Sequence, residues 1–215
     1  MKKSRSVPPD PYVELAKAAI RAFVERGEVL QADGCKCAGG SVGNSGSGSG
    51  SGGSGGSSGS GGIYEPLLRD RAGVFVSIKK NGELRGCIGT ISPVGENIAE
   101  EIIQNAISSC SHDPRFNPIG PEELPSLSVS VDVLSEPEPV KSVSELDVRR
   151  YGVIVSKGFR RGLLLPNLEG VNTVDYQLRI ALDKAGIGYK ETYAIQRFEV
   201  VRHDAGGMLN DEYRP

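Results

Sequence analysis

The sequence predicts an α+β fold with mainly antiparallel strands. Three stretches with apolar residues at a helical period begin near Asp10, Glu96 and Thr173, and they lie between runs that alternate apolar and polar residues. Two of the alternating runs are joined by Asn81-Gly82, the strongest short-range signal for a hairpin, because both turn residues must tolerate positive φ. Helices interspersed with hairpins are typical of α+β domains.

The first half of the chain contains a helix, a hairpin and a second helix. Asp10 caps the first helix and Gly27 ends it. The hairpin spans about 74–90, and the second helix spans roughly 96–109. The apolar stripe of the second helix consists of Ala99, Ile102, Ile103, Ala106, Ile107 and Cys110. Because Cys110 belongs to this stripe, core packing is a better explanation for it than chemistry.

The second half is predicted to contain strands and one more helix. Residues 127–133 alternate and form a strand with one polar face. Residues 151–155 and the apolar run 163–165 form a second hairpin. Residues 173–186 form a helix that begins at a Thr cap and ends at Gly, and 192–202 alternate as a final strand.

Composition divides the chain into one domain with variable additions. We expect a flexible head at 1–10, a domain at 11–203 and a C-terminal tail at 204–215. The segment 33–62 interrupts the domain and is rich in Gly and Ser. Such a segment cannot bury enough apolar surface to offset the entropy of ordering it, so we expect a disordered insertion or linker.

Charge and cysteine content exclude several classes of protein. The formal net charge of −2 provides no general attraction to nucleic acid or to an anionic membrane. No apolar run has the length of a membrane span. The four cysteines are irregularly spaced, which favours a reducing cytoplasm over a disulfide framework. Cys35 and Cys37 lack a nearby His or Cys to complete a structural zinc site, so no metal site is predicted.

The second strand of the first hairpin has the motif Leu84-Arg85-Gly86-Cys87-Ile88-Gly89-Thr90. A two-residue turn pairs Ile78 with Arg85. It also pairs Val76 with Cys87, so both side chains would lie on the aliphatic face. Glycines inside a strand indicate a bulge or a close approach by another group. One interpretation has Arg85 and Cys87 projecting into a pocket floored by glycine backbone. The alternative is a bulge that turns Arg85 to solvent and leaves Cys87 as a core residue.

Further candidates follow the second helix, in His112-Asp113-Pro114-Arg115-Phe116. Asp113 and Arg115 bracket a proline and are expected to form an ion pair. His112 could act as a general base because it titrates near neutrality, although a histidine at a helix end more often interacts with the helix dipole. The second hairpin has a cluster of three cations, for which a solvated tip is favoured over phosphate binding: Lys157, Arg160 and Arg161.

Four motifs occur in a characteristic order: residues 84–90, Asp113-Pro114-Arg115-Phe116, residues 127–134 and Arg161-Gly162-Leu163-Leu164-Leu165-Pro166. In these motifs the sequence resembles the AMMECR domain, named for the AMME syndrome candidate gene. It is most similar to the prokaryotic form called AmmeMemoRadiSam system protein A. The resemblance covers about 11–203 except the Gly/Ser segment. Ser111-His112 stands where the family has a Thr-Arg pair, which weakens a family-wide role for His112.

The resemblance implies two subdomains around a cleft and a partnership with a Memo-type protein and a radical SAM enzyme, but no established reaction. We therefore expect an enzyme or enzyme component in which Cys87 is the nucleophile or ligand and Arg85 holds an anionic group. Asp113 or Arg115 completes the site. The expected pocket consists of Gly86, Ile88, Gly89 and Phe116. The cofactor stays unknown.

Two other functions are kept as alternatives. The chain could be a non-catalytic interaction module that contacts the Memo-type protein or the radical SAM enzyme through the glycine-bearing hairpin. Nucleic-acid binding is less favoured, because the net charge is near zero and the basic residues lack interleaved aromatics.

Overall fold

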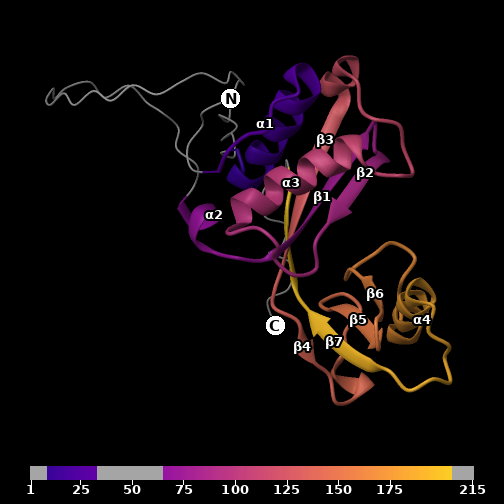
Figure 1. Cartoon of the computed structure of the whole chain (residues 1–215). Coiled ribbons are helices and arrows are strands. Elements are labelled where there is room, and N and C mark those ends of the chain that lie inside the picture. The colour runs from indigo at the N-terminus through magenta and orange to yellow at the C-terminus, as the bar shows by residue number, and fades with distance from the viewer. Residues whose placement is uncertain (1–8, 33–64, 205–215) are drawn as a thin grey trace, which may run out of the picture.

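The computed structural model describes residues 9–32 and 65–204, which form two lobes, each built on a four-stranded antiparallel sheet (Figure 1). Helices flank both sheets, so the predicted α+β class with antiparallel pairing is confirmed. Residues 1–8 of the expected head, the Gly/Ser segment with Cys35 and Cys37, and the expected tail from 205 onward fall outside the described residues. Asp10, which was expected to end the flexible head, belongs to the fold as the cap of α1 (Pro11–Arg26).

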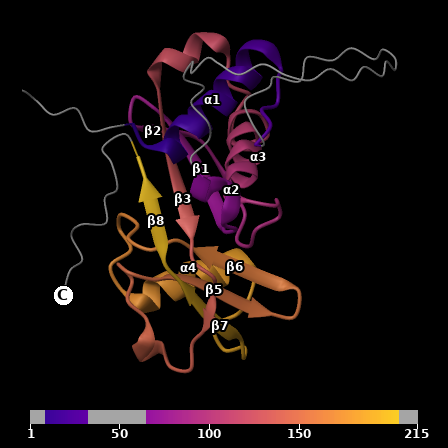
Figure 2. The same cartoon turned by 90° about the vertical axis from the view of Figure 1, so that its left-hand side faces the viewer.

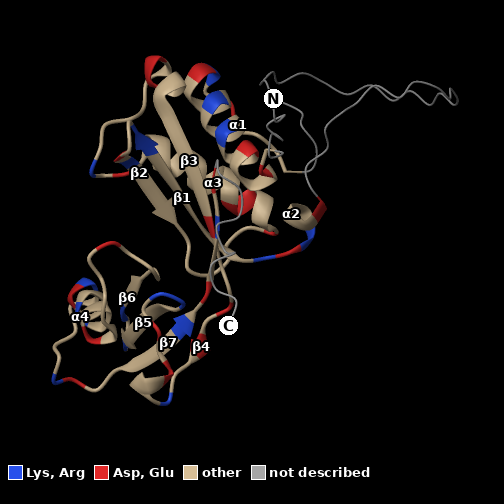
Figure 3. Cartoon of the chain, turned by 180° about the vertical axis from the view of Figure 1, so that it is seen from behind, with Lys and Arg blue, Asp and Glu red and all other residues tan. Residues whose placement is uncertain are grey.

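The first lobe has the strand order β2-β1-β3-β8. Its strands are β1 (Gly73–Lys80), β2 (Glu83–Gly89), β3 (Leu127–Leu134) and β8 (Val200–His203). Its helices are α1 (Pro11–Arg26), α2 (Glu65–Arg69) and α3 (Ile98–Ser111), with a 3₁₀ turn at Pro121–Ser126. The sheet places Val74, Val76 and Ile78 toward the helices, where all three are fully buried. The helices lie in front of this sheet in Figure 1, and the opposite face is turned to the viewer in Figure 3.

Local capping positions the two long helices of this lobe. The Asp10 carboxylate accepts a hydrogen bond of 2.9 Å from the Tyr12 amide, and Gly27 ends α1 in the left-handed conformation. Asn97 caps α3 through the Glu100 amide. The predicted helix at 96–109 is thus present and shifted by two residues.

The second lobe has the strand order β4-β7-β5-β6, with one helix on the sheet. Its strands are β4 (Glu138–Pro139), β5 (Gly152–Lys157), β6 (Arg160–Leu164) and β7 (Ala194–Phe198). Helix α4 (Val174–Ala185) buries Leu178, Ala181 and Leu182 against β5 and β6, and a 3₁₀ turn spans Val143–Glu145.

The lobes are joined by two chain crossings and an apolar cluster. The chain passes from β3 to β4 and returns from β7 to β8, so the second lobe is one continuous segment inserted between two neighbouring strands of the first sheet (Figures 1 and 2). Leu134, Ile154 and Phe198 are buried together where the lobes meet. This cluster fixes one end of the first sheet, on the face that the helices leave uncovered.

The prediction of one final strand at 192–202 was wrong. The segment forms two strands in different sheets, separated at Glu199. Here Glu199 exchanges two hydrogen bonds of 2.9 Å with Ser135, which follows β3, so the chain changes its pairing partner. Alternation continues through this switch, which is why the sequence pattern does not show it. Helix α2 and strand β4 were not predicted.

Candidate functional site

A β-bulge changes the predicted register of the first hairpin. The Asn81-Gly82 turn is present, but Ile78 lies opposite Gly86 and Lys79 opposite Leu84, so Arg85 is the extra residue. The predicted pairs of Ile78 with Arg85 and Val76 with Cys87 are therefore wrong by one position. A one-residue shift moves every side chain to the other face of the strand.

As a result, Gly86 faces helix α3 and not a pocket. A Cβ atom on Gly86 would lie well inside 3.0 Å of the Ser109 carbonyl oxygen. The Ser109 hydroxyl donates to the Val76 carbonyl at 2.8 Å and accepts from the Ile88 amide at 2.9 Å. Val76 and Ile88 are register partners, so this hydroxyl bridges the two strands. The close approach that the glycine permits is made by the protein's own helix.

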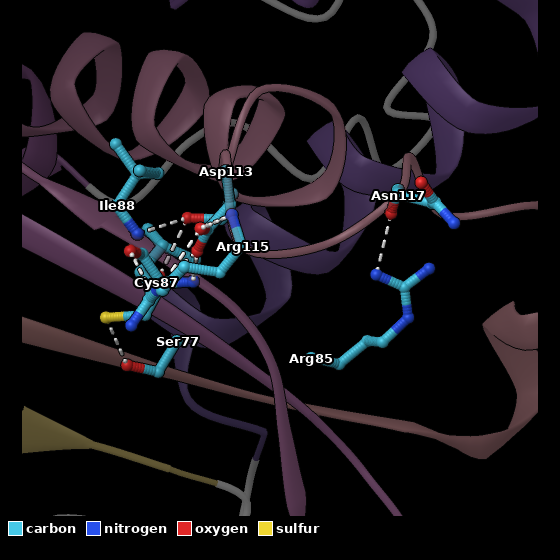
Figure 4. Close-up of polar contacts among 9 residues, drawn as sticks. Ser77, Arg85, Cys87, Ile88, Asp113, Arg115 and Asn117 are labelled. Atoms are coloured by element: carbon cyan, nitrogen blue, oxygen red, sulfur yellow. Dashed lines mark hydrogen bonds and ion pairs between the residues drawn. The ribbon is translucent and has the colours of Figure 1, made fainter.

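Arg85 lies apart from Cys87, as Figure 4 shows. Its guanidinium forms a two-point ion pair with Glu123, at 2.9 and 3.1 Å, and donates to the Asn117 carbonyl at 2.8 Å. The arginine at the bulge thus ties β2 to the segment that leads into β3. This placement differs from the expectation that Arg85 points into the same site as Cys87. It also differs from the alternative in which the bulge turns Arg85 to solvent.

Asp113 and Arg115 occupy the free edge of β2 at Cys87. The Cys87 amide donates to Asp113 Oδ2 at 2.9 Å, and Arg115 Nη2 donates to the Cys87 carbonyl at 3.1 Å. Arg115 also pairs with Asp113 at 2.6 Å, and these contacts form one cluster (Figure 4). Since β2 is an edge strand, this ion pair satisfies backbone groups that a further strand would otherwise take.

The electrostatics of this pair are asymmetric. The Asp113 side chain is 2% exposed, whereas that of Arg115 is 53% exposed. The hydrogen bond from Arg115 holds the pKa of the Asp113 carboxyl well below its usual range. Asp113 in turn raises the pKa of Arg115, and the Cys87 side chain adds to this effect. A buried carboxylate thus anchors a guanidinium that reaches the surface beside the thiol.

The Cys87 side chain lies on the face of the first sheet away from the helices. It is half-buried, and the Ser77 hydroxyl donates to its sulfur at 3.3 Å. On the same face Arg202 pairs with Asp132 at 2.7 and 2.9 Å. Asp132 raises the pKa of Arg202, and Asp204 and Cys87 add smaller contributions. The buried Asp132 therefore holds a second arginine on the sheet face that carries the Cys87 side chain.

We call Ser77, Cys87, Arg115 and Arg202, with the two buried aspartates, the thiol site. It contains three residues of the predicted catalytic set, Cys87, Asp113 and Arg115. Sequence reasoning missed Ser77, Asp132 and Arg202. The polar face of the strand at 127–133 was one available signal, because it contains the aspartate that fixes Arg202.

The predicted pocket residues lie on both faces of β2 and in the segment after α3. Ile88 faces the helices with Val76. Gly89 lies under the Phe75 ring, which would clash with any side chain there. The Arg115 guanidinium lies over the Phe116 ring, with its Cζ atom 5.4 Å from the ring centroid.

The remaining candidates from the sequence lie in the core, at a helix end or in ion pairs. Cys110 is buried, as expected, and burial raises the pKa of its thiol to about 11. His112 is the exposed C-cap of α3 and contacts the Ser111 hydroxyl at 2.7 Å. Lys157 and Arg160 both pair with Glu191. Within the described residues no cluster of His, Cys, Asp and Glu suits a metal ion.

A separate pocket of about 540 Å³ lies beside α4 in the second lobe. Tyr176, Tyr189 and Tyr193 line it, and Arg179 stacks over Tyr189 at 5.2 Å from the ring centroid. None of the predicted site residues belongs to this pocket.

Comparison with known proteins assigns the family. The AMMECR1 family model matches residues 13–203. The chain belongs to the AMMECR1 family. Among its relatives, protein CA_C1420 of Clostridium acetobutylicum is 45% identical over 201 residues, which cover 94% of this chain and 37% of that protein. A protein of Thermotoga maritima is 45% identical over 195 residues, covering 90% and 97% of the two chains.

A solved structure agrees with the architecture described above. The crystal structure of the uncharacterized protein PH0010 from Pyrococcus horikoshii matches with a TM-score of 0.71 and 27% identity, covering 89% of this chain and 88% of that one. The chain covers 37% of the C. acetobutylicum relative, so most of that protein lies outside the matched region. In the described part of the chain, each helix is too short or too polar to cross a membrane.

Proposed function

We propose that this AMMECR1-family chain is an enzyme or enzyme component that uses the Cys87 thiol as nucleophile or ligand. The observation that supports this most directly is the placement of Cys87 beside Arg115 and on the sheet face that also carries Arg202, two arginines that buried aspartates hold in position. On the opposite face, with Val76 and Ile78, a cysteine would be buried against the helices. Cys110 shows that alternative in the same chain.

The thiol site supplies directed donors more than net positive charge. Asp113 and Asp132 balance the charges of Arg115 and Arg202. A guanidinium has five N–H donors, and Asp132 takes only those on Nε and Nη2 of Arg202. The Nη1 hydrogens can bind an acceptor oxygen of a substrate placed beside the sulfur. In this proposal Cys87 acts as the nucleophile or ligand. The arginines orient a carbonyl, carboxylate or phosphate group of the substrate.

Alkylation of the native protein with iodoacetamide, followed by mass spectrometry, tests the proposal. We expect Cys87 to be modified while the buried Cys110 stays intact, and we expect a polar substrate to protect Cys87. The iodoacetate-to-iodoacetamide rate ratio should fall in Arg202→Gln, because a positive group near the sulfur attracts the anionic reagent. Full resistance of Cys87 to both reagents would contradict the proposal.

The proposed setting is a cytoplasmic system with a Memo-type protein and a radical SAM enzyme, as the family resemblance implies. The extra length of the C. acetobutylicum relative supports joint action with another protein unit. Size-exclusion chromatography of a mixture of the three purified proteins tests this partnership. A complex at micromolar concentrations is expected, and separate elution of all three would contradict the proposal.

The alternative of a non-catalytic module that binds through the glycine-bearing hairpin has less support. Helix α3 covers Gly86, and the Asp113–Arg115 pair occupies the β2 edge at Cys87. Nucleic-acid binding also has little support, since Lys and Arg are interspersed with Asp and Glu along both lobes (Figure 3).

A further inference from the structure

His203, the last residue of β8, forms a buried pair with Asp10 at the start of α1. Its Nδ1 atom lies 2.8 Å from Asp10 Oδ2, and the two side chains are 6% and 11% exposed. The His203 ring also stacks on the Tyr12 ring, with centroids 3.8 Å apart and an interplanar angle of 18°. The Asp10–His203 pair joins residues that are 193 positions apart, so it ties the end of β8 to the first helix.

The two oxygens of the Asp10 carboxylate have separate partners. Oδ1 caps α1 by accepting from the Tyr12 amide at 2.9 Å and from the Val13 amide at 3.4 Å, whereas Oδ2 contacts His203. A serine or threonine would serve as well for the cap alone. Taking a histidine–carboxylate pair out of water has a desolvation cost, and apolar packing is often as stabilising. What such a pair adds over apolar packing is a fixed direction of the groups that it joins.

The strand that ends at His203 is short and lies at the edge of the first sheet. β8 has 4 residues and pairs with β3, where His203 lies opposite Val131 and Arg202 lies opposite Asp132. Successive side chains of a strand point to opposite faces, so His203 faces α1 while Arg202 lies on the face of the thiol site. A short edge strand has few hydrogen bonds, so its end opens easily unless other contacts hold it.

We propose that His203 and Asp10 are positioning residues, which hold the end of β8 so that Arg202 stays directed over the sheet face of Cys87. The inference rests on the proposed function, because it concerns an arginine that is assigned there to substrate orientation. Asp132 holds the guanidinium through two contacts, at 2.7 and 2.9 Å. The Asp10–His203 pair holds the backbone from which the same side chain starts, and it acts from the opposite face of the sheet.

Nuclear magnetic resonance of the full chain, labelled with nitrogen-15, tests the inference at the Nε–H group of Arg202. This group donates to Asp132 Oδ1 at 2.7 Å, so its exchange with water reports how often the pair opens. His203→Leu removes the Asp10–His203 pair and leaves an apolar side chain, whereas Asp10→Ser removes the pair and keeps a cap for α1. Exchange should be roughly tenfold faster in both variants, because the end of β8 opens more often.

Two further variants separate positioning from general stability. His203→Asn should restore slow exchange at Arg202, because its side-chain amide can place a donor where Nδ1 lies. The matched control is Val201→Ala, since Val201 belongs to the same strand and is 37% exposed. This control should leave the exchange of the Arg202 Nε–H group unchanged. The melting temperature of Asp10→Ser should stay near the wild-type value, because the helix cap is retained.

Alkylation of Cys87 connects the Asp10–His203 pair to the thiol site. The iodoacetate-to-iodoacetamide rate ratio should fall about twofold in His203→Leu, on the order expected when one charge near the sulfur is displaced. The double variant His203→Leu/Arg202→Gln should have the same ratio as Arg202→Gln alone, because the pair acts through Arg202.

Wild-type exchange of the Arg202 Nε–H group in both His203→Leu and Asp10→Ser overturns the inference, whatever the reactivity of Cys87. Faster exchange with an unchanged rate ratio also overturns it where Arg202→Gln lowers the ratio. Loss of folding in His203→Leu together with wild-type exchange in Asp10→Ser overturns it as well, since the histidine would then serve packing alone. Resistance of Cys87 to both reagents contradicts the proposed function instead, and the exchange rate still decides whether the pair positions Arg202.

Discussion

Arg85 and Glu123 form a two-point ion pair, with Nη2 to Oε1 at 2.9 Å and Nε to Oε2 at 3.1 Å. Their side chains are 17% and 13% exposed, so the pair is largely shielded from water. Lys80 joins it at 3.0 Å from Glu123. The arginine of the family motif therefore connects the bulged strand to the segment before β3, and the arginines of the thiol site come from elsewhere in the chain.

Replacing this arginine should affect stability and not the thiol. Arg85→Met should lower the free energy of unfolding by about 1–3 kcal/mol, because Glu123 and two backbone carbonyls lose a charged donor. The rate of Cys87 alkylation should stay within about twofold of wild type in the folded protein, on the order expected for a charge outside the site. Urea titration and alkylation rates measure the two effects. A large loss of Cys87 reactivity with unchanged stability would contradict this prediction and would mean that Arg85 acts on the Cys87 thiol.

A side chain at Gly86 should destabilise the fold. Gly86→Ala places a methyl group against the Ser109 carbonyl of α3, and overpacking of this kind costs about 1–3 kcal/mol or more. Thermal unfolding should show a clear decrease in Tm. Ser109→Ala should not rescue Gly86→Ala, because the clash is with backbone. Wild-type stability for Gly86→Ala would mean that α3 can move away from β2.

Acid should remove the contribution of the Arg85–Glu123 pair. Hydrogen bonds from Arg85 and then Lys80 lower the pKa of Glu123 from 4.5 to about 2. A carboxyl whose pKa is lower in the folded state stabilises the fold above its unfolded pKa and loses this effect as pH falls. Glu123→Gln should therefore be about 1–3 kcal/mol less stable than wild type at pH 7. The difference should decrease between pH 4.5 and 2. A difference that is constant over this range would contradict the assignment.

Asp113 should stabilise the fold and position Arg115. Asp113→Asn removes the charge that Arg115 binds and weakens the acceptor of the Cys87 amide, at a cost of about 1–3 kcal/mol at neutral pH. The iodoacetate-to-iodoacetamide rate ratio at Cys87 should change as well, because the local charge becomes more positive and Arg115 is released. Arg115→Lys is the matched variant that keeps the charge but loses the two-point geometry. Unaltered stability and an unaltered ratio in Asp113→Asn would exclude this role.

Features that depend on local chemistry could be predicted from the amino-acid sequence alone. The caps Asp10 and Thr173 and the left-handed glycines Gly27 and Gly186 place the helix ends that the structure shows. The Asn81-Gly82 turn forms as predicted, and the motif around Cys87 identifies the family. These features depend on residues within a few positions of one another, so their physical causes are visible in a short window.

The groups that meet at Cys87 are brought together by long-range packing, which the sequence pattern does not show. A single extra residue, Arg85, reverses the faces of the strand, and the bulge arises where α3 packs closely on Gly86. Glu123 lies 38 residues from Arg85 in the sequence, and Arg202 reaches the thiol face because the chain returns to the first sheet as β8. Such pairings depend on long-range packing of α3 and on which sheet a strand joins, and neither leaves a periodic signal in the sequence.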